Sequence, residues 1–316
     1  MSAPDAPLDT DRPFRRRDAL AAGVTDKELR GPGYRSLAHG VYVGTQVPVS
    51  PALHARAAAL PFPEGSWASH VSAALIHRVP LPQALEQPTG RQQVTVTRAR
   101  DRRSRDGVDC YLRPAGLTML KDGTRVSQPA QLFVELAEVL DRLDLVVAGD
   151  HLVRRTSLTL SQLLAFCAAT TLPGGEAARA AVTDVRERVD SPMETRLRML
   201  IVWAGLPEPR VNFTIRDECG VPVRMYDLSY PEQRLAIDYD GRVHIDRAES
   251  WEEDTERREL SHDDGWRLIT VLARGVYVTP ERTLERIRRA ALERGVPGVP
   301  AVLGDGWRPH FARLRA

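Results

Sequence analysis

Two apolar runs joined by a short turn, each carrying one aspartate, constrain the fold of this chain more than any other feature. Residues 223–230 contain Asp227, and residues 235–239 contain Asp238. Both runs have the composition and length of β-strands, and the Pro-Glu-Gln segment between them predicts a turn. If the two strands are neighbours in a sheet, this turn brings both carboxylates to the same end of that sheet.

Two carboxylates in otherwise buryable strands need a physical explanation. A buried carboxylate is costly unless it is paired, hydrogen-bonded or bound to a metal. Asp227 and Asp238 would repel each other, and a divalent cation would relieve that repulsion. Such a pair is the minimum for a Mg²⁺ or Mn²⁺ site that holds a phosphate and activates a water. The alternative is that both acids face solvent at strand ends, and the pattern alone does not decide between the two.

The segment before these strands begins with a helix signal. Ser191 suits the N-cap, Pro192 the first helical position and Glu194 the third, and apolar residues follow at helical spacing. The pattern by itself explains Glu194 as a capping acid. After the strands, a polar helix precedes a last apolar strand over residues 266–272. The predicted order is helix, strand, strand with Asp, strand with Asp, helix, strand.

Residues 191–295 resemble the compact PD-(D/E)XK nucleases related to very-short-patch-repair endonucleases. The matching segments are SPMETRLRMLIVWAGLPEP, VRMYDLSYPEQRLAIDYDGRVH and DTERRELSHDDGWRLITV. A large group of uncharacterised actinobacterial proteins shares this pattern. The resemblance covers about a third of the chain. It implies a restriction-endonuclease-like domain that uses Mg²⁺ or Mn²⁺ to hydrolyse DNA.

The resemblance also implies a role for individual residues. Asp227 matches the metal-binding aspartate, and Asp238 occupies the (D/E) position of the motif. Glu194 matches a helix acid that often completes the metal shell. His244 matches a histidine expected near the scissile phosphate, where it would donate or accept a proton.

One position departs from the general motif. Asp240 stands two residues after Asp238, where the motif has a lysine, although close relatives of the compact group often replace that lysine. The group that stabilises the transition state in its place is left open. Arg257, on the predicted polar helix, is one candidate and could also contact DNA.

Residues 14–43 predict a small helical unit followed by a strand pair. A helix over residues 15–22 precedes a second helix capped by Thr25 and Glu28, and short strands follow over residues 34–37 and 40–43. This is the layout of a winged helix-turn-helix, and the stretch resembles the N-terminal unit of AbiEi-type antitoxins. Basic residues that could meet DNA phosphates are Arg15, Arg16, Arg17, Lys27, Arg30 and Arg35. They could equally form an ordinary solvated face.

The middle of the chain carries no catalytic constellation. His54, His70 and His77 lack companions at metal-ligand spacing, so packing or hydrogen-bonding roles are expected. The adjacent Asp150 and His151 are also interpreted as structural. This region resembles the segment that follows the winged helix in AbiEi-like proteins, which implies a contact with a protein partner.

Composition sets the remaining expectations. The net charge is only +2, so the distribution of arginines indicates nucleic-acid binding better than the total charge does. The three isolated cysteines fit a reducing cytoplasm, and no apolar stretch is long enough for a signal peptide or a membrane span. No nucleotide-binding glycine motif occurs.

The sequence therefore predicts an α+β protein. Its predicted divisions are a winged-helix-like DNA-binding unit (1–48), a middle α/β region (49–172), a connecting helix (173–189), a PD-(D/E)XK nuclease-like domain (190–297) and a C-terminal tail (298–316). The expected function is metal-dependent DNA endonuclease activity, in repair or defence. The alternative is a DNA-binding regulator or antitoxin-like protein whose nuclease-fold domain is catalytically silent.

Overall fold

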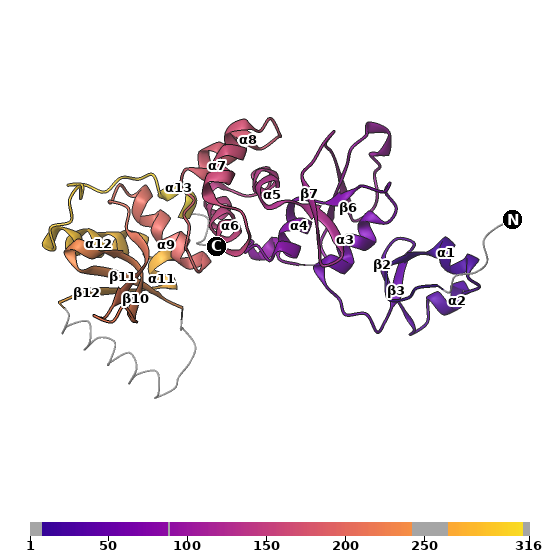
Figure 1. Ribbon diagram of the computed structural model, residues 1–316, viewed down its shortest axis with the longest axis horizontal. Coiled ribbons are helices and arrows are strands. Elements are labelled where there is room, and N and C mark those ends of the chain that lie inside the picture. The colour runs from indigo at the N-terminus through magenta and orange to yellow at the C-terminus, as the bar shows by residue number, and fades with distance from the viewer. Residues whose placement is uncertain (1–7, 88, 242–264, 312–316) are drawn as a thin grey trace. The chain divides into compact units, whose positions relative to one another are not determined.

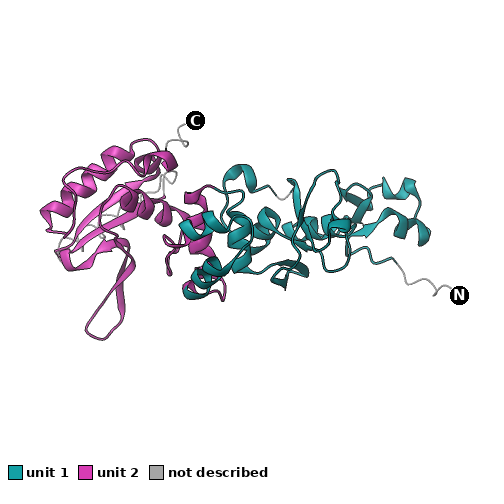
Figure 2. Ribbon diagram, turned by 90° about the horizontal axis from the view of Figure 1, so that it is seen from above, with its two compact units in different colours: residues 1–140, 161–180 teal, residues 141–160, 181–316 magenta. Residues whose placement is uncertain are grey.

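The computed structural model describes residues 8–87, 89–241 and 265–311. The chain divides into two compact units (Figure 2). The first comprises residues 1–140 and 161–180, and the second comprises residues 141–160 and 181–316. Within the described residues the fold is mixed α and β, with three-, four- and five-stranded sheets. None of the helices in those three ranges is long and apolar enough to cross a membrane.

The N-terminal part of the first unit contains the predicted helices and hairpin. The elements are β1 (Phe14–Arg15), α1 (Arg16–Ala21), α2 (Asp26–Leu29), β2 (Tyr34–Ala38) and β3 (Val41–Gly44). The predicted capping box is confirmed, since the Glu28 amide donates to Thr25 Oγ1 (3.3 Å) and the Thr25 amide donates to Glu28 Oε2 (2.7 Å). Strand β1, which the sequence pattern did not indicate, adds to the hairpin in the antiparallel order β1-β3-β2.

The rest of the first unit is built on the five-stranded sheet, in the order β6-β5-β4-β8-β7. Its strands are β4 (Trp67–Ala68), β5 (Gln92–Val96), β6 (Val108–Leu112), β7 (Thr118–Lys121) and β8 (Thr124–Ser127). The helices of this part of the chain are α3 (Pro51–Ala59), α4 (His70–His77), α5 (Pro129–Leu136), α7 (Leu160–Ala169) and α8 (Gly175–Val182), with 3-10 turns at Gln83–Leu85 and Ala99–Asp101.

The second unit contains the predicted strand pair within a four-stranded sheet (Figure 1). The order is β12-β11-β10-β9, with β9, β10 and β11 antiparallel and β12 parallel to β11. The strands are β9 (Arg210–Arg216), β10 (Pro222–Tyr230), β11 (Leu235–Asp240) and β12 (Arg267–Leu272), with a 3-10 turn at Pro231–Gln233. The helices are α6 (Arg142–Arg155), α9 (Pro192–Trp203), α11 (Ala273–Tyr277), α12 (Pro280–Glu293) and α13 (Arg308–Phe311). Helix α9 contacts β10, β11, α11 and α12.

A buried ion pair joins α6 to α9 in this unit. Arg198 Nη2 lies 3.0 Å from Asp150 Oδ2, and the two side chains are 1% and 2% exposed. The Asp150 carboxylate also accepts from Thr195 Oγ1 (2.9 Å) and from the Arg186 amide (2.7 Å). Burial raises the pKa of the Asp150 carboxyl, whereas Arg198 opposes that rise. Asp150 therefore has a structural role, as predicted from the sequence.

The predicted connecting helix (173–189) is too long, because α8 spans only Gly175–Val182. The Arg186 amide bonds to the Asp150 carboxylate in place of a helical carbonyl, and Arg188 has a left-handed backbone with φ of 67°. These contacts come from residues distant in sequence, so local periodicity could not reveal them.

Candidate functional site

Asp227 and Asp238 lie together on the adjacent strands β10 and β11. The antiparallel register pairs Leu228 with Ile237. Continuing it by one residue on each strand places Asp227 opposite Asp238. The Asp227 amide donates to Asp238 Oδ1 (3.1 Å), and the Tyr239 amide donates to Asp227 Oδ2 (2.8 Å). The sequence prediction that the turn brings these acids together therefore agrees with the geometry.

These bonds replace part of the backbone ladder, because each carboxylate accepts from an amide of the neighbouring strand. An ionised carboxylate has about four lone-pair sites, so accepting a backbone amide does not by itself prevent it from binding a cation. Both aspartates are half-buried and keep access to solvent. The arrangement can serve either as a pair of structural acceptors or as two oxygen ligands for Mg²⁺.

Asp240 follows Asp238 at the end of β11. Residues two apart on a strand project to the same side, so Asp240 lies on the same side of β11 as Asp238. Burial raises the pKa of the adjacent Tyr239 phenol, and the Asp240 charge raises it further. Asp240 therefore places a negative charge where the nucleases that this segment resembles have a lysine.

Glu194 holds the start of α9 against β9. Its amide donates to Ser191 Oγ (3.2 Å), which confirms the predicted cap, and its carboxylate accepts from the Asp190 amide (3.0 Å). Glu194 Oε2 also lies 3.2 Å from Asn212 Nδ2. The Glu194 side chain thus contacts both the residue before the cap and strand β9. Strand β9 is the neighbour of β10, which carries Asp227.

Asn212 is a residue of this region that the sequence interpretation missed. The pairs Val211 with Leu228 and Phe213 with Tyr226 flank it, so it lies across from Asp227. Asn212 is 5% exposed, and its φ of 46° is left-handed, a region in which asparagine is enriched among residues other than glycine. An asparagine, a residue type depleted in strands, within the strand segment RVNFTIR was the available signal.

The Asn212 amide joins three segments. Nδ2 donates to the Arg188 carbonyl, to Asp190 Oδ2 (3.2 Å) and to Glu194 Oε2 (3.2 Å). Asn212 Oδ1 is buried and finds no hydrogen-bond partner among the described residues. Asn212 therefore ties Glu194 and the segment before α9 to strand β9.

Asn212→Asp should test this role, because it keeps the shape of the side chain but adds a charge beside Asp190 and Glu194. We expect the variant to lose about 1–3 kcal/mol of stability at neutral pH. Thermal unfolding at neutral pH measures the loss. Equal stability of the variant and the wild type at neutral pH would contradict the role.

A complete metal shell is not visible within residues 8–87, 89–241 and 265–311. Those residues contain no group of three or more His, Cys, Asp or Glu side chains placed to hold an ion. The predicted site also includes His244, and its DNA contact includes Arg257, both of which lie outside the described residues. The Mg²⁺ or Mn²⁺ site therefore stays a prediction that rests on Asp227 and Asp238.

Several basic residues predicted to meet DNA have partners within the first unit. Arg16 forms an ion pair with Asp26, and Arg17 lies 3.4 Å from Asp18. The other three arginines donate to backbone carbonyl oxygens: Arg15 to Leu60, Arg30 to Asp26 (3.1 Å) and Arg35 to Val47 (3.1 Å). Lys27 is exposed at α2. The unit presents less uncompensated charge than the sequence suggests, and its contact with DNA stays a prediction.

Two of the three middle histidines, His70 and His77, are buried and hydrogen-bonded in the first unit. His70 is fully buried, stacks on Tyr111 with ring centroids 3.8 Å apart, and its Nδ1 lies 2.9 Å from Ser69 Oγ. Glu135 accepts from the His70 amide (3.2 Å), and His77 Nε2 lies 3.0 Å from the Ser127 carbonyl. The hydrogen-bonding role expected for His70 and His77 is confirmed.

Comparisons with known proteins leave the family open. No family model and no solved structure matches the chain. Two proteins of Mycobacterium tuberculosis are similar to it: "Uncharacterized protein MT2308" of strain CDC 1551 / Oshkosh and "Uncharacterized protein Rv2248" of strain H37Rv. Each is 28% identical over 169 residues, which is 53% of this chain and 62% of the relative. The chain thus spans less than two thirds of the relatives it matches.

Proposed function

We propose that the second unit is a metal-dependent DNA endonuclease of restriction-endonuclease-like architecture. The observation that carries this proposal is the juxtaposition of Asp227 and Asp238 on adjacent strands, linked through backbone amides. Helix α9, its acid Glu194 and the strand order around the pair support the same interpretation. The test is cleavage of supercoiled plasmid DNA with Mg²⁺ or Mn²⁺, compared with cleavage in the presence of a chelator.

The donor atoms present suit Mg²⁺, which prefers oxygen ligands and is commonly bound by one or two carboxylates. When bound, Mg²⁺ supplies an acidified water and neutralises charge on the phosphate. Asp227 and Asp238 would hold the ion, with the Tyr239 carbonyl as a further oxygen. Glu194, positioned by Asn212, would bind the ion directly or orient a water. His244 would transfer the proton.

The N-terminal part of the first unit is proposed to bind DNA as a winged-helix-like module, while the middle region contacts a protein partner. The protein would act on DNA in the cytoplasm. The support is the order of two helices and a hairpin with an exposed Lys27 on α2.

Lys27→Ala should weaken DNA binding and lower the salt dependence of binding by about one unit on a log–log plot, because one phosphate contact is lost. Arg78→Ala is the matched control, since Arg78 is an exposed cation at the end of α4 in the same unit. Fluorescence anisotropy over a salt series measures the slope. Equal slopes for the two variants would assign the N-terminal unit to protein contacts instead.

The second candidate function is a DNA-binding regulator with a catalytically silent second unit. Two observations favour it: Asp240 at the lysine position of the motif, and carboxylates that already accept backbone amides. A silent unit predicts DNA binding without cleavage under any divalent metal. It also predicts no change in the thermal midpoint when Mg²⁺ or Mn²⁺ is added.

A further inference from the structure

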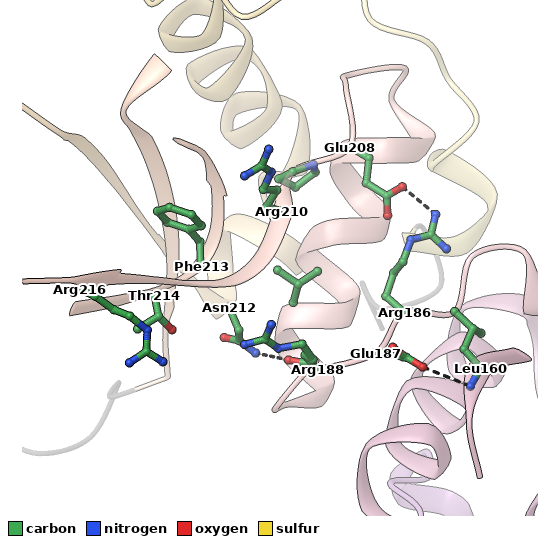
Figure 3. Close-up of a pocket in the computed structure, with 12 residues that line it drawn as sticks. Leu160, Arg186, Glu187, Arg188, Glu208, Arg210, Asn212, Phe213, Thr214 and Arg216 are labelled. Atoms are coloured by element: carbon green, nitrogen blue, oxygen red, sulfur yellow. Dashed lines mark hydrogen bonds and ion pairs between the residues drawn. The ribbon is translucent and has the colours of Figure 1, made fainter. Parts of the chain in front are cut away.

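A groove runs along β9 in the second unit, on the side of the segment that precedes α9 (Figure 3). Its volume is about 710 Å³, and β9 is an edge strand of the four-stranded sheet. We call it the β9 groove. Its charged lining comprises four arginines and two glutamates: Arg186, Arg188, Arg210, Arg216, Glu187 and Glu208. The groove is therefore basic although the whole chain is nearly neutral.

The four arginines differ in how firmly the protein holds them. Arg186 is engaged by Glu208 (2.7 Å) and by backbone carbonyls, and Arg216 donates to the Gly220 carbonyl (2.8 Å). Arg210 pairs with Glu232 at 2.6 Å, but both side chains are 59% exposed. Such a surface pair contributes at most about 1 kcal/mol, so a stronger anion can displace it.

Arg188 has the most available guanidinium. It is exposed, and among the described residues no hydrogen bond or ion pair is formed by its side chain. Its backbone is left-handed with φ of 67°, and its carbonyl accepts from Asn212 Nδ2, the contact drawn as a dashed line in Figure 3. Asn212 is itself left-handed with φ of 46°. Strained residues persist only where the surroundings hold them, and they concentrate at binding and active sites.

We propose that the β9 groove binds the phosphodiester backbone of a nucleic acid, with Arg188 and Arg210 as the principal phosphate contacts. The planar guanidinium offers forked donors that match phosphate oxygens in pairs. Asn212 lines the groove, bonds to Glu194 and lies across from Asp227, so the groove borders the strand that carries one of the two proposed catalytic aspartates. The inference rests on the proposed function, because it identifies the groove that guides the substrate.

The experiment measures binding without catalysis. Full-length protein is titrated into labelled single-stranded DNA, duplex DNA and single-stranded RNA in a chelator, over a range of salt concentrations. The double variant Arg188→Ala/Arg210→Ala is compared with Arg282→Ala/Arg289→Ala, which removes two exposed arginines of α12 in the same unit. Unchanged thermal midpoints of both variants show that the folds are equivalent.

The groove variant should bind more weakly than the control, and its salt slope on duplex DNA should be smaller by about two units, since about 0.9 unit is lost per phosphate contact. The nucleic acid that shows the largest difference is the substrate class. Equal slopes for the two double variants on all three probes overturn the proposal. Cleavage is measured separately, so wild-type protein that uses the groove but cuts nothing refutes the nuclease and leaves the groove intact.

Discussion

Arg198→Ala is expected to lower the free energy of unfolding of the second unit by about 3–5 kcal/mol, because it leaves the buried Asp150 carboxylate without its counter-charge. The Arg198 side chain is 1% exposed, and it also donates to Glu208 Oε1 (3.1 Å) and to the Asp184 carbonyl (2.8 Å). Both contacts are lost in the variant. The effect is large because the Asp150 side chain is only 2% exposed, so solvent screens its uncompensated charge poorly.

The control for Arg198→Ala is Arg210→Ala, which removes an arginine whose ion pair is 59% exposed. The control should cost at most about 1 kcal/mol. Denaturant unfolding, with hydrogen exchange of the α6 and α9 amides, follows the second unit by itself. A loss for Arg198→Ala no greater than that of the control would show that the buried pair does not stabilise the unit.

Acidification should reduce the deficit of Arg198→Ala. Burial already raises the pKa of Asp150 in the wild type, and removing Arg198 raises it further. A carboxyl whose pKa is raised by folding destabilises the folded state at pH values above that pKa. The folded state therefore regains stability as the pH falls through the raised pKa of Asp150 toward the pKa that this carboxyl has in the unfolded chain. A deficit that grows on acidification would contradict this linkage.

Asp227→Asn is expected to reduce metal-dependent cleavage by about 10³-fold or more, because it removes one charged oxygen ligand while the side chain keeps its size. Folding should be preserved, since the Asn carbonyl oxygen can still accept from the Tyr239 amide as the carboxylate does at 2.8 Å. The metal-free protein should be as stable as the wild type or more stable, because repulsion from Asp238 is relieved.

Asp217→Asn is the matched control for Asp227→Asn. Asp217 lies in the exposed turn between β9 and β10 and accepts from the Cys219 amide (2.9 Å) and the Val221 amide (2.8 Å). Both variants thus neutralise an aspartate that holds backbone amides in the same unit. Equal loss of activity in the two would indicate an effect of net charge or folding instead of metal binding.

Local sequence signals predicted the elements that local interactions determine. The Ser191 cap, the Thr25–Glu28 box and the hairpin that brings Asp227 to Asp238 depend on residues close in sequence. They could be predicted because capping and turn chemistry operate over a few residues.

Other features depend on contacts between distant segments. The chain after α8 is held by a hydrogen bond from the Arg186 amide to the Asp150 carboxylate. Asp150 lies 36 residues before Arg186 in the sequence. The left-handed conformations of Arg188 and Asn212 arise where the two residues meet, 24 positions apart. Neither contact leaves a periodic pattern, so the β9 groove and the positioning role of Asn212 emerge only from the folded chain.

The most direct test of the nuclease hypothesis is the rate at which wild-type protein, Asp227→Asn and Asp217→Asn convert supercoiled plasmid DNA to nicked or linear forms with Mg²⁺ or Mn²⁺. DNA binding by all three is measured in parallel. The hypothesis predicts cleavage by the wild type and by Asp217→Asn, none in a chelator, and binding without cleavage by Asp227→Asn. Wild-type protein that binds DNA but cuts none of it with either metal, or Asp227→Asn that cuts as fast as the wild type, would contradict it.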